Sequence, residues 1–117
     1  MKVKQVIQIL DSKIITGEEF IENDVFSACG SDLMSDVLAF VKDQGMLLTG
    51  LVNPQVIRTA EMMDIHTIVF VRGKQPDDSV KEMAKERDMV ILTTDYPLYV
   101  ACGKLYEAGL SGGRPTL

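Results

Sequence analysis

Beyond residue 45, apolar residues gather in three short unbroken runs, and each run is followed by a turn and an amphipathic segment. The runs are residues 46–49, 67–71 and 90–94, and the segments begin after Pro54, Pro76 and Pro97. Asp77 is well placed to cap the segment that begins after Pro76. Unbroken runs of this length are typical of strands buried on both faces, whereas apolar residues repeated at i, i+3 and i+4 indicate helices. Three strand-turn-helix units in succession predict a parallel sheet covered by helices.

The N-terminal part of the chain carries weaker signals of the same two kinds. They predict a helix over 2–11, strands over 13–16 and 25–28, and a helix from a cap at Ser31 or Asp32 to near Gly45. Because the two strands are short, we expect them at the edges of the sheet.

Together the patterns predict an α/β fold, a three-layer α/β/α sandwich around a mainly parallel sheet of about five strands. At 117 residues the chain suits one core, so we expect a single domain over 1–117 with a frayed tail over 110–117. The last helix, expected from about Tyr96 to Ala108, contains Gly103. A glycine inside a helix suggests close approach to a neighbouring backbone.

Composition and charge argue against several classes of function. A net charge of −5 without a basic stripe argues against nucleic acid as a partner. No apolar run approaches the roughly 18 residues of a membrane span, and the N-terminal residues lack the pattern of a cleavable leader. We therefore expect no membrane association and a cytoplasmic location, with Cys29 and Cys102 as reduced thiols.

The carboxyl ends of parallel strands meet at one edge of a sheet, and helix N-termini with unpaired N–H groups point to the same edge. This edge favours an anionic ligand, and Arg72 adds a guanidinium suited to a carboxylate or phosphate. The residues predicted to bind the ligand are Thr49, Gly50, Asn53, Arg72, Gly73, Thr93, Thr94 and Asp95. Four members of this set also suit helix caps and turns, which are the commoner roles of such residues in loops: Thr49, Asn53, Thr94 and Asp95.

No pattern of a catalytic or metal centre is found in the sequence. The glycine-rich fingerprints of dinucleotide and P-loop sites are missing. His66, the only histidine, has no nucleophile or acid at motif spacing and is expected in a turn. We therefore expect no catalytic residue, no metal ligand and no cofactor.

Two further groups of residues offer weaker hypotheses. Two copies of Cys29 and Cys102 would supply the four thiolates of an iron–sulfur cluster, but Cys102 on an apolar stripe is more simply a core residue. Met62, Met63 and Met89 are candidates for an adaptable surface that contacts a partner protein.

The stretch from Leu47 to Leu105 resembles the DRTGG domain family, and it is also similar to the N-terminal regulatory domain of HPr kinase/phosphorylase. The residues that carry the resemblance are Leu48-Thr49-Gly50, Gly73, Pro76-Asp77, Ala84-Lys85-Glu86 and the run from Val90 to Asp95. The sequence departs from the name-giving motif. It has Val71-Arg72-Gly73 in place of Thr-Gly-Gly, and Asn53-Pro54 near the place of Asp-Arg.

The resemblance implies a usually non-catalytic domain that is attached to enzymes or to CBS-type nucleotide-sensing domains, often at an oligomer interface. It also implies an association with NADH-linked iron hydrogenase systems. Our leading hypothesis is a regulatory or ligand-sensing domain that binds a small anionic or nucleotide-like ligand and forms a homodimer. Two alternatives remain: an assembly partner of a redox enzyme such as an NADH-linked iron hydrogenase, and a small transferase or phosphatase using Asp95 and Arg72.

Overall fold

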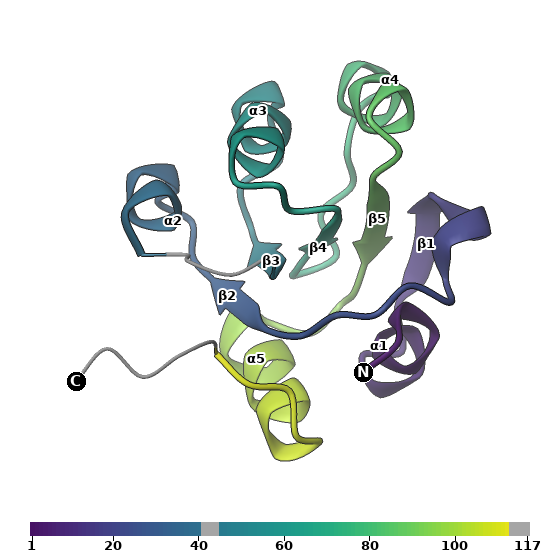
Figure 1. The fold of residues 1–117 in the computed structure, drawn as a ribbon, viewed down its shortest axis with the longest axis vertical. Helices are drawn as coiled ribbons and strands as arrows, with labels where there is room; N and C mark the ends of the chain where they lie inside the picture. Colours follow the sequence, from purple (N-terminus) through teal and green to yellow (C-terminus); the bar gives the residue numbers. More distant parts are fainter. Residues whose placement is uncertain (41–44, 113–117) are drawn as a thin grey trace.

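The computed structural model describes residues 1–40 and 45–112, which form five strands and five α-helices around one sheet (Figure 1). In chain order the elements are α1 (Val3–Ile9), β1 (Lys13–Thr16), the 3₁₀ turn η1 (Glu18–Phe20), β2 (Ala28–Gly30), α2 (Met34–Phe40), β3 (Met46–Thr49), α3 (Pro54–Met62), β4 (Thr67–Phe70), α4 (Asp78–Glu86), β5 (Val90–Thr93) and α5 (Leu98–Glu107). None of these helices has the length and apolar character needed to span a bilayer.

The strands form a single sheet in the order β1-β5-β4-β3-β2. Strands β2 to β5 are mutually parallel, and β1 alone runs antiparallel, against β5. The predicted parallel core is confirmed, because Leu48 pairs with Val69 and Val69 pairs with Leu92. The two short N-terminal strands occupy the two edges of the sheet, as expected.

Helices cover both faces of the sheet, which confirms the predicted three-layer architecture. Helices α2, α3 and α4 lie on one face, and α1 and α5 lie on the other (Figure 1). Each step from β2 to β5 moves to the next strand in the same direction, so right-handed crossovers leave the three connecting helices on one face. Successive strand residues therefore alternate between two cores.

Two helix starts follow the predicted capping chemistry. The side-chain oxygens of Asn53 and Asp77 accept hydrogen bonds from the amides of Val56 (3.3 Å) and Val80 (2.9 Å), at the N-termini of α3 and α4. Each cap satisfies one of the amides that the first turn of a helix leaves unpaired. Both helices consequently begin at the edge of the sheet where the parallel strands end.

The second strand lies three residues later than predicted, at Ala28–Gly30 instead of 25–28. Val25 is buried in the core beside Val3 of α1, and its amide donates to the Met1 carbonyl oxygen (2.6 Å). Because this segment already has apolar and hydrogen-bonding partners among the first residues of the chain, pairing with β3 begins only at Ala28.

Residues 110–112, expected to be frayed, pack against the edge of the sheet. Leu110 is buried, and the Ala28 amide donates to the Ser111 carbonyl oxygen at 2.9 Å. The rest of the predicted tail, 113–117, lies outside the described residues. The predicted helix end near Gly45 falls beside 41–44, which also lie outside them.

Candidate functional site

Three of the predicted site segments meet at one edge of the sheet because their strands are in register. Thr49 at the end of β3 pairs with Phe70 of β4, and Phe70 pairs with Thr93 at the end of β5. The turns that follow these strands therefore leave the sheet side by side. They bring Gly50 and Arg72 into one cluster.

Asp32, in the loop between β2 and α2, is the centre of this cluster. One carboxylate oxygen, Oδ1, accepts hydrogen bonds from the Gly50 amide (2.6 Å) and the Thr49 hydroxyl (3.1 Å). The other, Oδ2, lies 3.5 Å from Nη2 of Arg72. The sequence suggested Asp32 only as a helix cap, whereas the structure gives it a role in joining the ends of two strands.

The Arg72 guanidinium extends across Gly50. A Cβ atom added at Gly50 would lie 2.5 Å from Nη2 of Arg72, so the missing side chain is what gives the guanidinium its place. The Arg72 and Asp32 side chains are 53% and 49% exposed. An ion pair that exposed is worth about 0–1 kcal/mol, so the guanidinium remains available to a competing anion.

The backbone around Arg72 is held in an uncommon conformation. Arg72 and Gly73 both have positive φ, at 58° and 67°. Their amides donate to the carbonyl oxygens of Tyr96 and Thr94, both at 2.9 Å. A Cβ atom added at Gly73 would lie 3.1 Å from Oδ1 of Asp95, which places Asp95 beside this turn. The loop after β5 thus fixes the position from which Arg72 extends.

Other predicted site residues have structural roles. Asn53 caps α3, and Thr93 is buried within the sheet. The Thr94 hydroxyl donates to the Leu10 carbonyl oxygen (2.8 Å) and accepts from the Tyr96 amide (3.3 Å). These contacts fit the cap and turn roles considered from the sequence. That any of the predicted residues binds a ligand stays a prediction.

The loop after β5 lines a small hollow at the carboxyl edge. A cavity of about 70 Å³ lies there, lined by Leu10, Asp11, Thr94, Asp95 and Tyr96. From β2 to β5 the strand order never reverses, so the central strands lack the deep crevice that forms where it does. A ligand at Arg72 would therefore lie on the surface of the edge.

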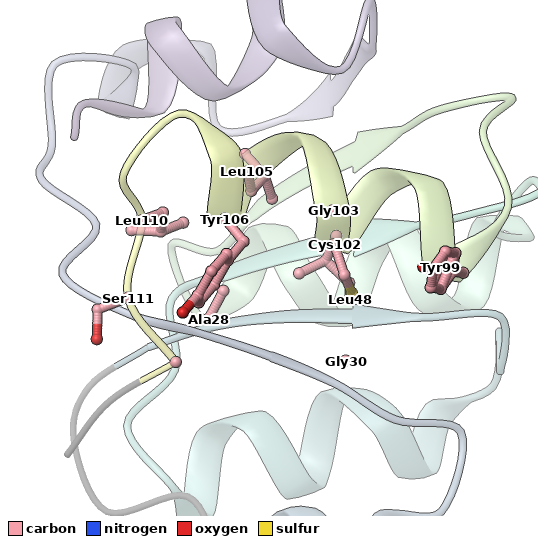
Figure 2. A pocket seen from close by; sticks show the side chains of 11 residues that line it. Ala28, Gly30, Leu48, Tyr99, Cys102, Gly103, Leu105, Tyr106, Leu110 and Ser111 are labelled. Atoms are coloured by element: carbon pink, nitrogen blue, oxygen red, sulfur yellow. The ribbon is translucent and has the colours of Figure 1, made fainter. Parts of the chain in front are cut away.

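A larger cavity of about 370 Å³ lies beside α5, at the edge strand β2. Figure 2 shows Tyr99 near one end of the labelled residues, with Cys102 between Tyr99 and Tyr106 and with Leu110 and Ser111 beyond Tyr106. Gly103 also lines it, and a Cβ atom added at Gly103 would meet nothing within 4 Å. Close approach to a backbone of the same chain, the reason predicted for this glycine, is therefore wrong.

The described residues do not support a metal centre. In residues 1–40 and 45–112, no group of three or more His, Cys, Asp or Glu side chains is placed to hold a metal ion. Burial raises the pKa of the thiols of Cys29 and Cys102, which disfavours the thiolate form that metals require. Cys29 packs with the core under α2 to α4 and Cys102 with the core under α1 and α5.

The predicted methionine surface does not form as expected. Met62 is 73% exposed at the end of α3, whereas Met89 is 2% exposed and belongs to the core. Met89 directly precedes β5, and its side chain packs in the core under α2 to α4. His66 pairs with Asp64 (2.9 Å) at the surface, in the loop before β4.

No family model matches the chain, and no curated protein matches its sequence. A similar solved structure is the crystal structure of the CBS and DRTGG domains of the regulatory region of Clostridium perfringens pyrophosphatase, complexed with its activator diadenosine tetraphosphate. The TM-score is 0.74 at 14% sequence identity, and the match covers 95% of this chain. The chain spans 48% of that structure's length. At this identity the likeness establishes a DRTGG-related fold and nothing finer.

Proposed function

We propose that this chain is a non-catalytic regulatory domain, which senses a small anionic or nucleotide-like ligand at the carboxyl edge of its sheet and forms a homodimer. The observation that carries the proposal is the half-exposed guanidinium of Arg72, which lies across Gly50 and has one loosely held carboxylate partner, Asp32. A ligand phosphate or carboxylate would displace that partner and form a charge-assisted hydrogen bond with Arg72.

Two other features support an anionic ligand at this edge. The nine-residue helices α3 and α4 begin here, and a helix N-terminus carries about half a positive charge. The pyrophosphatase region of similar fold is complexed with a nucleotide activator. A nucleotide-like ligand, with phosphates at Arg72, fits both features.

Substituting Arg72→Gln is expected to weaken ligand binding by about tenfold or more, since it removes the charge that the anion would contact. The measurement is isothermal titration calorimetry with a panel of adenine nucleotides and small organic phosphates. Arg58→Gln is the matched control, because Arg58 is exposed on α3 and is not among the contacts given above for Asp32. Lack of binding by the wild type to any panel member, or equal loss in both variants, would reject this site.

Substituting Asp32→Asn is expected to change affinity in the opposite direction. The amide oxygen can still accept from Gly50 and Thr49, while the negative charge that competes for Arg72 is removed. Because an exposed pair contributes about 0–1 kcal/mol, we expect the same ligand to bind up to about fivefold more tightly. Weaker binding by Asp32→Asn, with unchanged thermal stability, would mean that the carboxylate itself contacts the ligand.

A second candidate function is assembly with a redox enzyme such as an NADH-linked iron hydrogenase. Exposed apolar side chains on the α2 and α3 side of the molecule favour a protein partner, with Leu38 42% and Met62 73% exposed. Co-purification with hydrogenase subunits from native extracts would support this function. A wild-type pull-down that retains no such subunit, compared with a Met62→Glu pull-down as background, would count against it.

A further inference from the structure

Gly103 lies in the middle of α5, and no contact given within the same chain requires a glycine there. A glycine in a helix interior is less favourable than alanine, because it loses more backbone freedom on folding. Neither close packing nor a positive φ requires glycine here, because an added Cβ atom would have no neighbour within 4 Å. The missing side chain therefore leaves a flat place on an exposed part of the helix.

Two tyrosines flank this flat place on the same side of α5. Tyr99 and Tyr106 stand four residues before and three residues after Gly103, a spacing that puts the three residues on one stripe of a helix. The tyrosines are 86% and 76% exposed, among the most exposed large apolar residues of the described chain. Buried aromatic side chains of this size dominate the energetics of protein interfaces.

A hollow lies beside the stripe. The 370 Å³ cavity runs between α5 and β2, with Ala28, Gly30 and Leu48 among the residues that line it (Figure 2). Among the described residues, those that line it carry no charged side chain, although a quarter of the chain's residues are charged. The described walls of the hollow therefore set no like charges against each other when two copies meet there, despite a net charge of −5 on each copy.

We propose that this patch, formed by Tyr99, Gly103, Tyr106 and the adjoining hollow, is the surface through which two copies of the chain associate. Protruding rings and a hollow on one patch make it self-complementary, as a two-fold interface requires. The two α5 helices would run antiparallel and cross at Gly103, where backbones approach most closely. The rings of each copy would enter the other's hollow. This inference rests on the homodimer proposed above and is independent of the ligand at Arg72.

The exposed area of the two tyrosines supplies part of such an interface. An aromatic side chain buries about 150–250 Å² at a contact, so two tyrosines at the observed exposures offer about 350 Å² per copy. A stable dimer buries about 800 Å² per partner. The walls of the hollow and the rest of the outer face of α5 would supply the remainder.

Analytical ultracentrifugation of the full chain over a concentration series tests the proposal. The wild type is expected to dimerise, and Tyr106→Glu is expected to weaken dimerisation by about tenfold or more, because it places a buried charge in the contact. Met62→Glu is the matched control, since Met62 is 73% exposed on the opposite face and is expected to leave dimerisation unchanged. Circular dichroism verifies that each variant is folded.

Gly103→Ala provides a second test, because it is expected to raise the stability of the folded monomer and to lower the affinity of the dimer. The folded monomer should become more stable, because alanine favours the helix and its Cβ atom has free space. The dimer should become weaker, because the added methyl group separates the two helices. A monomeric wild type would overturn both the homodimer and this surface. A dimer unaffected by Tyr106→Glu and Gly103→Ala would overturn this surface alone.

Discussion

Substituting Phe70→Ala is expected to lower the free energy of unfolding by about 3–5 kcal/mol. Phe70 lies in β4, the middle strand of the sheet, and is fully buried among the core residues under α2 to α4. The residue pairs with Thr49 on one side and Thr93 on the other. Because both neighbouring strands fix the backbone here, the structure has little freedom to close the cavity that a shorter side chain leaves.

The matched control for this substitution is Phe26→Ala, since Phe26 is 71% exposed and a surface change of this kind costs about 0.5 kcal/mol or less. Equilibrium unfolding in urea, at one fixed protein concentration, measures both variants. Equal losses of stability in the two variants would contradict the buried position of Phe70. The same result would also contradict the strand register that places the candidate site at one edge.

The central sheet was predictable from the sequence because its strands are buried on both faces. Such strands need unbroken apolar runs, and each run here is separated from the next by one helix with a recognisable start. Asn53 and Asp77 marked two of those starts correctly. Parallel order then follows, because a strand-helix-strand unit returns the chain in the same direction.

The edge strand β2 was harder to predict because its sequence carries little information about pairing. Ala28–Gly30 is three residues long and has no strong apolar pattern. The neighbouring Val25 and Phe26 look more like strand residues, but Val25 packs beside α1 and Phe26 is exposed. A tertiary contact with the N-terminal helix therefore decided where the strand begins, and local propensity does not encode such a contact.

The candidate site was predictable in its location but not in its connections. Strand ends indicated the edge at which Gly50 and Arg72 meet, because that edge follows from the parallel topology. Asp32 stands 18 residues before Gly50 and 40 before Arg72, and neither separation forms a local pattern. The sequence indicated Asp32 as a candidate helix cap. Its contacts with Gly50 and Arg72 depend on how close the loops lie in the folded chain, which the sequence does not show.

Substituting Gly17→Ala is expected to lower the free energy of unfolding by about 2–4 kcal/mol, from left-handed backbone strain and overpacking together. Gly17 follows the edge strand β1 and has a φ of +86°. An added Cβ atom would lie 2.8 Å from Cα of Val90 and 3.0 Å from the carbonyl oxygen of Met89. Both are backbone atoms, and β5 holds them in the sheet, so they cannot move aside at low cost.

Gly50→Ala is the matched control, because the same methyl group meets a movable partner there. Gly50 has no positive φ, and its nearest neighbour is the end of the flexible Arg72 side chain. The free energy of unfolding in urea should therefore change by about 0.5 kcal/mol or less. Calorimetry should register weaker ligand binding, because the methyl group moves the guanidinium out of its place across Gly50. A large loss of stability in Gly50→Ala, or none in Gly17→Ala, would contradict this division between a glycine that holds the fold and one that shapes the site.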